Sequence, residues 1–430
     1  MTNKTFAVCT LGCKVNAYES ECLAALFEKE GLTKVDFSER ADIYLINTCS
    51  VTNTGDKKSR QAIHKARRQN PDAFIAVCGC YAQAKAEEVS LSGADLVAGT
   101  SDREKIVSRA MEGIGGSLVE DISKKREFEE LSEKPVTERC RAYIKIQDGC
   151  NNFCSYCIIP YTRGRVRSRK QDSVINEAIR LKNEGFSEIV LAGIEVYSYG
   201  SDLGDTSLIG LLEELSSAVK IPRIRLSSID PRAFTDEFIK RLSRIPGLCR
   251  HFHISAQSGC DETLKRMNRP NTAEEFLEIL KKIRAVMPDA AVTTDIITGF
   301  PGETEEEFLK TREFLKKAEF SRLHVFPYSE RSGTRAAKME QLPVHIRSER
   351  AKVLIEDGKG YAHAFSEKQL GKTLNVLAEY EKDGVYFGYS ENYVRVGFRG
   401  TDIKVGEIYP VIAEKVFDDA SVSGKIVKEK

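Results

Sequence analysis

The sequence predicts an α/β protein in three parts: an N-terminal doubly wound parallel α/β domain, a central open (β/α)6 partial barrel and a small C-terminal all-β barrel of OB-like type. Three observations predict this. Apolar runs alternate with helical patterns up to residue 112, and a second such series extends from residue 142 to 326. Five short strand-like runs then follow in about sixty residues. We expect domains at 1–112, 140–368 and 369–430, joined by a linker at 113–139.

Composition excludes several classes of protein. Lys and Arg number 65 against 64 Asp and Glu, so the formal net charge is +1 and any RNA contact needs a local basic patch. No stretch reaches the roughly 18 apolar residues of a membrane span. Twelve cysteines without a secretory signal favour a reducing compartment and metal or core roles over disulfides. We therefore expect a cytoplasmic protein with no membrane partner.

The first domain has apolar runs at residues 6–9, 43–46, 74–77 and 96–98, each followed by a helical pattern. Such alternation is typical of a parallel sheet covered on both faces, and ligands bind such sheets at the carboxyl ends of the strands. Three cysteines follow three successive strands and should meet at that edge. They are Cys13, Cys49 and Cys80. With no fourth ligand evident, we interpret them as the ligands of an open four-iron cluster.

Other features of this domain have two interpretations each. Cys78 remains an alternative third ligand if the strand continues through Gly79, whereas Cys9 and Cys22 are expected in the core. The helical pattern 56–69 carries six basic residues, which form either a solvated face or a phosphate-contacting strip beside Cys49.

The central domain has six apolar runs, at residues 142–147, 188–192, 223–228, 251–256, 292–297 and 322–326. Cys150, Cys154 and Cys157 come just after the first run, at spacings of four and three. Thiolates suit iron–sulfur clusters or zinc, and three of them leave one iron of a four-iron cluster open. The alternative is a set of structural cysteines or a zinc knuckle.

The C-x3-C-x2-C spacing, with Tyr156 before the third cysteine, resembles that of radical S-adenosylmethionine (radical SAM) enzymes. The resemblance implies that SAM binds the open iron and is cleaved to a 5′-deoxyadenosyl radical. The stretches 10–16, 47–52 and 79–83 resemble the N-terminal domain of the methylthiotransferases, a radical SAM subfamily with two [4Fe–4S] clusters. The C-terminal barrel is similar to their TRAM domain.

Strand ends of the central domain outline a pocket for SAM. By resemblance we assign Tyr156, Gly193, Gln257 and Asp295 to cofactor binding. The segment 163–170 carries four arginines and one lysine, which suit phosphate, the carboxylate of SAM or acidic neighbours. The stretches 255–256 and 269–272 depart from the family pattern and leave the shape of the substrate pocket open.

Five of the aromatic side chains in the C-terminal barrel either stack on bases or fill the core. They are Tyr386, Phe387, Tyr389, Tyr393 and Phe398.

Residues 10–20 and 53–60 point to the MtaB-type branch of the methylthiotransferases. That branch implies methylthiolation of carbon 2 of N6-threonylcarbamoyladenosine at position 37 of tRNA, with two SAM molecules. The first triad would carry the sulfur that is methylated, and the second would cleave SAM. A reduced flavodoxin or ferredoxin-like donor is implied. The alternatives are a sister enzyme acting on isopentenyladenosine or on a ribosomal-protein aspartate, an iron–sulfur electron carrier, and an RNA-binding protein with structural zinc.

Overall fold

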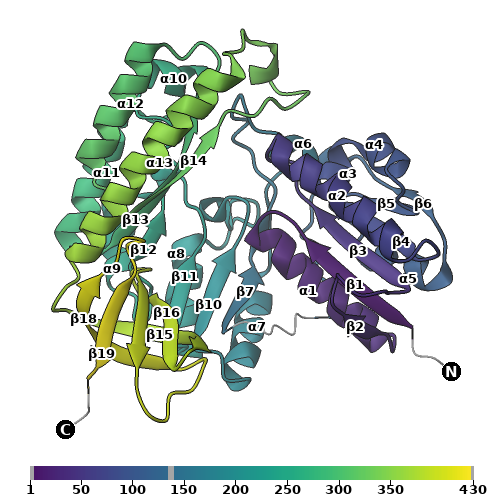
Figure 1. The fold of residues 1–430 in the computed structure, drawn as a ribbon, viewed down its shortest axis with the longest axis horizontal. Coiled ribbons are helices and arrows are strands. Elements are labelled where there is room, and N and C mark those ends of the chain that lie inside the picture. The colour runs from purple at the N-terminus through teal and green to yellow at the C-terminus, as the bar shows by residue number, and fades with distance from the viewer. Residues whose placement is uncertain (1–3, 134–139, 428–430) are drawn as a thin grey trace.

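The computed structural model describes residues 4–133 and 140–427. The part of the predicted linker at 134–139 lies outside the described residues. The first domain lies beside the central one, and the C-terminal barrel packs beneath the central strands (Figure 1). No described helix is both long and apolar enough to cross a membrane.

The first domain is a six-stranded parallel sheet with the order β2-β1-β3-β4-β5-β6. Its strands are β1 (Thr5–Thr10), β2 (Thr33–Val35), β3 (Ile43–Thr48), β4 (Phe74–Gly79), β5 (Leu96–Ala98) and β6 (Gly116–Leu118). Its helices are α1 (Lys14–Lys29), α2 (Asn53–Gln69), α3 (Cys80–Ala84), α4 (Ala86–Leu91) and α5 (Glu104–Glu112).

The predicted doubly wound fold is confirmed, with apolar clusters on both faces of the sheet. The strand order reverses at β1, so the switch point, where such folds bind ligands, lies between β1 and β3. Two strands were not predicted, because β2 is short and polar and β6 falls in the range assigned to the linker.

The central domain contains two three-stranded parallel sheets. One holds β7 (Arg141–Lys145), β10 (Glu188–Ala192) and β11 (Arg223–Leu226); the other holds β12 (His251–His253), β13 (Ala291–Thr298) and β14 (Arg322–Pro327). A parallel bridge between Ile229 and Ile254 joins them, so six parallel strands form the predicted open array. A two-stranded antiparallel pair, β8 (Gln147–Asp148) and β9 (Arg167–Ser168), follows β7.

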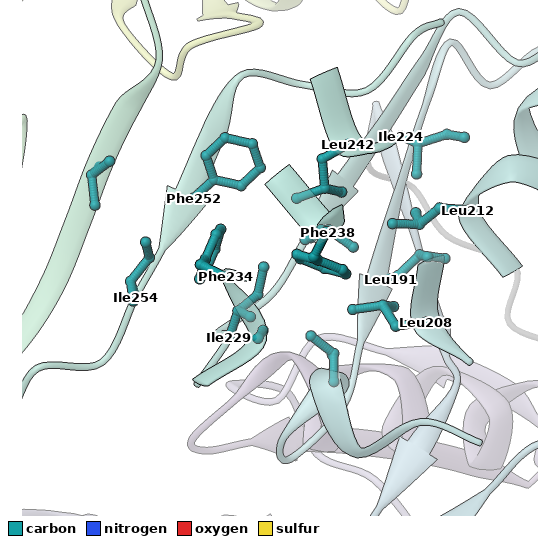
Figure 2. Close-up of a cluster of buried hydrophobic side chains, with 14 of the residues drawn as sticks. Leu191, Leu208, Leu212, Ile224, Ile229, Phe234, Phe238, Leu242, Phe252 and Ile254 are labelled. Carbon is teal, nitrogen blue, oxygen red and sulfur yellow. The ribbon is translucent and has the colours of Figure 1, made fainter. Parts of the chain in front are cut away.

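Helices cover the outer face of this array. They are α7 (Gln171–Asn183), α8 (Leu208–Glu214), α9 (Asp236–Ser243), α11 (Ala273–Val286), α12 (Glu305–Ala318) and α13 (Val344–Glu367). Beneath them lies a cluster of buried aliphatic and aromatic side chains, with Phe234, Phe238 and Phe252 at its centre (Figure 2). Two short helices, α6 (Ile159–Arg163) and α10 (Asp261–Arg266), lie outside this layer, and α6 contacts α3 of the first domain.

Side-chain alternation along the strands makes the inner face polar. Ile144, Leu191 and Ile224 point outward into the apolar cluster, so their strand neighbours point inward. The inner face, called the lumen below, carries Arg141, Lys145, Glu188, Arg225, His253, Asp295 and His324. The N-terminal end of the strands is the floor of the lumen, and the cysteine loop lies at the opposite end.

The C-terminal domain is a closed barrel with the order β15-β16-β17-β19-β18, as predicted. Its strands are β15 (Thr373–Lys382), β16 (Val385–Ser390), β17 (Arg395–Arg399), β18 (Ile408–Val416) and β19 (Val422–Ile426).

The aromatic side chains of this barrel have different places. Phe398 is in the core and Tyr386 packs against it. Tyr393 stacks between Tyr389 and His251, with ring centroids 4.6 Å away on each side, and so closes the floor of the lumen. Phe387 stacks on the exposed Tyr380, so base stacking stays a prediction for Phe387.

Candidate active site between two cysteine triads

The second triad lies in one loop between β8 and α6. Cys150, Cys154 and Cys157 are half-buried, and the amide of Cys157 donates to the carbonyl of Cys154 over 3.0 Å. Gly149, at φ +73°, precedes the triad, and a Cβ there would lie 1.9 Å from the carbonyl oxygen of Arg165. The loop therefore needs glycine at this point to turn tightly around the three thiols.

Hydrogen-bond donors face the sulfurs of this loop. The amide of Asn152 lies 3.4 Å from Cys150 Sγ, and Arg269 Nη1 lies 3.8 Å from Cys154 Sγ. Burial raises the pKa of the Cys150 thiol to about 11 and also raises that of Cys157. These thiols therefore stay protonated at neutral pH unless a metal displaces the proton.

The first triad is assembled from three loops at the carboxyl edge of the first sheet. Cys13 is the N-cap of α1, Cys49 lies between β3 and α2, and Cys80 is the first residue of α3. Gly12, at φ +100°, lies so close to Cys49 that an added Cβ would be 2.8 Å from Cys49 Cβ. The three thiols lie within electrostatic reach of one another, as the topology predicts.

Cys13 lies in a recess rather than on an open surface. Its side chain is accessible to solvent, yet burial among surrounding atoms raises the pKa of its thiol. Burial likewise raises the pKa of the Cys49 thiol to about 12. A recess lined by thiols offers soft ligands away from bulk water.

Gly79 separates the two candidates for the third ligand. It has φ +97°, and a Cβ there would lie 2.5 Å from Thr48 O, so the strand ends at this residue. Cys78 is 1% exposed and packs among the apolar side chains under α1 and α5. Cys80 instead reaches the interface with the central domain, where Arg163 Nε lies 3.3 Å from its Sγ.

The two triads face each other across that interface. Cys157 of the central domain lies within electrostatic reach of Cys80 of the first domain. Arg163, at the end of α6, joins them because it follows the second triad in sequence and contacts the first in space. It is fully buried, and Nη2 donates to Asn16 Oδ1 over 2.6 Å and to Glu19 Oε2 over 3.1 Å.

Arg163 belongs to a buried ionic network. Its cations are Arg103, Lys145, Arg163 and Arg167, and its carboxylates are Glu19, Glu129 and Asp148. Burial alone would raise the pKa of Glu19, but Arg103, Arg163 and Lys145 lower it to about 2. Four cations thus face three carboxylates in this network, which reaches Cys80 through the Nε of Arg163.

A second arginine braces the loop that holds Cys49. Arg331, 4% exposed and located after β14, pairs with Asp56 over 2.7 Å. It also donates to Asn53 and to the carbonyl of Ser50. Two arginines of the central domain thus hold loops of the first triad.

The arginine-rich segment after the second triad is mostly internal. Arg163, Arg167 and Arg169 are buried and paired with carboxylates, while Arg165 is exposed over the ring of Phe153. Of the three kinds of partner expected from the sequence, Arg163, Arg167 and Arg169 therefore have acidic side chains. Within this segment, phosphate contact stays a prediction for the two exposed cations, Arg165 and Lys170.

The basic residues of helix α2 also fall into two groups, one paired with carboxylates and one exposed. Arg60 and Arg67 pair with Glu88 and Asp95. The exposed cations are Lys57, Lys58, Lys65 and Arg68, of which the first two lie in the turns that follow Cys49. Phosphate contact by this surface stays a prediction.

Of the four residues assigned to SAM, the structure pairs Gln257 with Asp295, whereas Gly193 follows β10 and Tyr156 lies in the loop of the second triad. Gln257, at φ +70°, pairs its backbone with Asp295 and Ile297 of β13. Tyr156 packs edge-on against Phe300. A Cβ on Gly193 would lie 2.9 Å from Gln147 Oε1, so this glycine admits Gln147 close to the backbone.

Sequence reasoning missed the roles of Arg269 and Arg331. Arg269 lies in one of the segments that depart from the family pattern and donates to Ser255 O, in the other, over 2.9 Å. It also faces Cys154, so the two unusual segments meet beside the second triad. No local spacing signals the contacts of Arg269 with Cys154 and of Arg331 with Asp56, since these pairs are 115 and 275 positions apart.

The three thiols of each triad are a donor set that fits an iron–sulfur cluster. Within 4–133 and 140–427, no three His, Cys, Asp or Glu side chains could hold one metal ion. Each triad has three thiols on loops, and an arginine side chain faces one of the three sulfurs. Donors to cluster sulfurs are among the features that tune such groups.

Comparisons with known proteins agree with this geometry. Residues 144–315 match the model of the radical SAM superfamily, and residues 5–99 match the uncharacterized protein family UPF0004. The chain is also similar in fold to the radical SAM methyltransferase TsrM of Kitasatospora setae, with a TM-score of 0.57 and 17% identity over 77% of this chain and 74% of that one.

Three relatives match nearly the whole chain and are named for a specific reaction. Threonylcarbamoyladenosine tRNA methylthiotransferase MtaB of Bacillus subtilis is 46% identical, covering 95% of this chain and 93% of that protein. The MtaB of Thermotoga maritima is 38% identical, covering 98% of this chain and 96% of that protein. A tRNA-2-methylthio-N(6)-dimethylallyladenosine synthase of Pelotomaculum thermopropionicum is 37% identical, covering 95% of this chain and 94% of that protein. The chain is therefore a radical SAM enzyme, with SAM and a [4Fe–4S] cluster as cofactors, and it belongs to the MtaB family of tRNA methylthiotransferases.

Proposed function

We propose that this enzyme adds a methylthio group to carbon 2 of N6-threonylcarbamoyladenosine at position 37 of tRNA. A Bacillus subtilis relative named for that nucleoside is 46% identical along nearly the whole chain. The observation that carries the proposal is the meeting of two cysteine triads across one interface, with Cys80 and Cys157 within electrostatic reach. One triad alone would suffice for SAM cleavage, so the second triad supports a further chemical task.

We assign a [4Fe–4S] cluster to each triad. Cys13, Cys49 and Cys80 would hold the first, and Cys150, Cys154 and Cys157 the second. When bound, these clusters and SAM supply the radical and sulfur chemistry that side chains lack. The chain itself supplies ligands, orientation and a recess.

The protein groups around the triads have distinct tasks in this proposal. Arg163 and Arg269 hold one sulfur of each triad by hydrogen bonds. Arg331 fixes the loop of Cys49. Tyr156, Gly193, Gln257 and Asp295 line the SAM site. The enzyme would receive electrons from a reduced flavodoxin or ferredoxin-like protein and act where mature tRNA is found, in the cytoplasm.

Nucleoside mass spectrometry of total tRNA tests the proposal. Cells lacking the gene should lose the methylthio form of threonylcarbamoyladenosine and accumulate threonylcarbamoyladenosine without the methylthio group. Complementation with the intact gene, but not with Cys150→Ala, should restore the product. An unchanged level of that product, with loss of the methylthio isopentenyl nucleoside instead, would assign the enzyme to the sister reaction.

A further inference from the structure

The lumen contains positive charge that described carboxylates do not neutralise. Lys14 follows Cys13 at the start of α1 and lies within electrostatic reach of Arg141, Arg225 and Tyr393. Arg322 begins β14 and is exposed. Within the described residues, neither the Lys14 ammonium nor the Arg322 guanidinium forms an ion pair.

The alternation along β14 shows which way its side chains point. Leu323 and Val325 pack against the apolar cluster of the central domain. Arg322 and His324 are on the opposite face, which is the lumen. The register places Arg322 beside Thr293 and His324 beside Asp295, so the two side chains lie at successive levels of one wall.

The lumen carboxylates Asp295 and Glu188 are already engaged. Asp295 Oδ2 lies 3.2 Å from Nε2 of His253, whose Nδ1 lies 2.9 Å from Thr293 Oγ1. At the floor, Glu188 is shared by Arg141, Arg223 and Arg225. An anion entering the lumen would therefore meet Lys14 and Arg322 without displacing an existing pair.

A cavity lies where this wall meets the C-terminal barrel. Its volume is about 230 Å³, and Thr293, Arg322, Tyr389 and Tyr393 are among its lining residues. Small-molecule pockets are usually larger than about 300 Å³, so this cavity suits a substituent rather than a whole nucleoside. Arg395 and Asp419, which also line it, pair with each other over 3.6 Å.

We propose that Lys14, Arg322 and His324 form an anion subsite that binds the carboxylate of the N6-threonylcarbamoyl group. The inference rests on the proposed function and names the residues that select its nucleoside. The dimethylallyl group is neutral and apolar, so it cannot form an ion pair with Lys14 or Arg322, and both cations would stay unpaired in its complex. Selection by a charge that only one substrate carries is more effective than selection by shape alone.

Binding of short RNAs to the holoenzyme tests the subsite without relying on turnover. Three anticodon stem-loops are compared by fluorescence anisotropy: one with threonylcarbamoyladenosine, one with its neutral methyl ester and one with unmodified adenosine. The intact enzyme should bind the first most tightly. Arg322→Met should weaken that complex about 10- to 100-fold, the range for a hydrogen bond to a charged group, and change the other two little.

Matched variants separate the subsite from a general loss of charge. Arg322→Lys should retain part of the affinity, because it keeps the charge and loses the planar fork. Arg244→Met removes an exposed arginine at the end of α9, outside the lumen, and should leave all three affinities unchanged.

Two results would overturn the subsite. Equal weakening of all three complexes by Arg322→Met would show a contact to backbone phosphate, and no weakening would show no contact. Neither result affects the nucleoside analysis of tRNA from cells, which tests the proposed function on its own.

Discussion

The two cysteine triads are built in different ways. The second occupies eight consecutive residues of a single loop, from Cys150 to Cys157. The first is collected from three loops between residues 13 and 80, and arginines of another domain brace it. The second is thus a local motif, whereas the first depends on the interface between two domains. The predictions below test this difference, from the largest effect to the smallest.

Removing one ligand from each triad should give opposite defects. Cys150→Ala should abolish SAM cleavage, measured as 5′-deoxyadenosine formed under reducing conditions. Cys13→Ala should spare cleavage and abolish methylthio transfer to tRNA. Each variant should lose roughly half of the bound iron if each triad holds one four-iron cluster. Methylthio transfer by the Cys13→Ala enzyme would show that the first triad does not serve that step.

Arg163→Met should damage the first triad more than the second. It leaves Glu19 and Asp148 with one cation fewer in a buried site, which should lower the free energy of unfolding by about 3–5 kcal/mol. Thermal unfolding measures this loss, and iron content with SAM cleavage shows which triad suffers. Arg163→Lys should recover part of the stability. Unchanged stability and full methylthio transfer in Arg163→Met would refute the bracing role.

Arg331→Met should have a smaller effect of the same kind. It removes the contacts to Asp56, Asn53 and Ser50 O, at a cost of about 1.5–3 kcal/mol. The loss is smaller because Lys85, 3.8 Å from Asp56, still compensates that carboxylate. Iron content after purification is the measurement. The exposed Arg335→Met offers a neighbouring control, and equal iron in both variants would contradict the prediction.

Cys78→Ala should have the smallest effect. Its thiol lies in the apolar core, so its loss should cost about 1 kcal/mol in unfolding free energy and leave iron content intact. Cys80→Ala, two residues away, should lose the first cluster. Iron loss in Cys78→Ala with normal iron in Cys80→Ala would exchange the two assignments.

The cysteines were predictable from sequence because their signals are short-ranged. The spacing from Cys150 to Cys157 is visible in one line of sequence. The first triad becomes visible once the alternation of strands and helices predicts that three strand ends share an edge. The same alternation predicted all six central strands, and short strand-like runs separated by turn residues predicted the five strands of the barrel.

The bracing arginines were not predictable, because their partners are far away in sequence. Arg331 and Asp56 are 275 residues apart. For the arginine-rich segment 163–170, the sequence left phosphate, the carboxylate of SAM and acidic neighbours open as partners, because composition does not show burial. Only the packing of α1 against the central domain reveals that Arg163 faces Asn16, Glu19 and Cys80.

The bracing of Cys49 by Arg331 has a consequence for biosynthesis. The ribosome makes all three loops of the first triad early, but Arg331 follows Cys80 by 251 residues. At about 5–20 residues per second, roughly 13–50 s separate the two. During that interval the loops lack one of their supports and the thiols are open to oxidants or to the wrong metal. The nascent chain therefore reaches a shape that can receive its first cluster only late in translation.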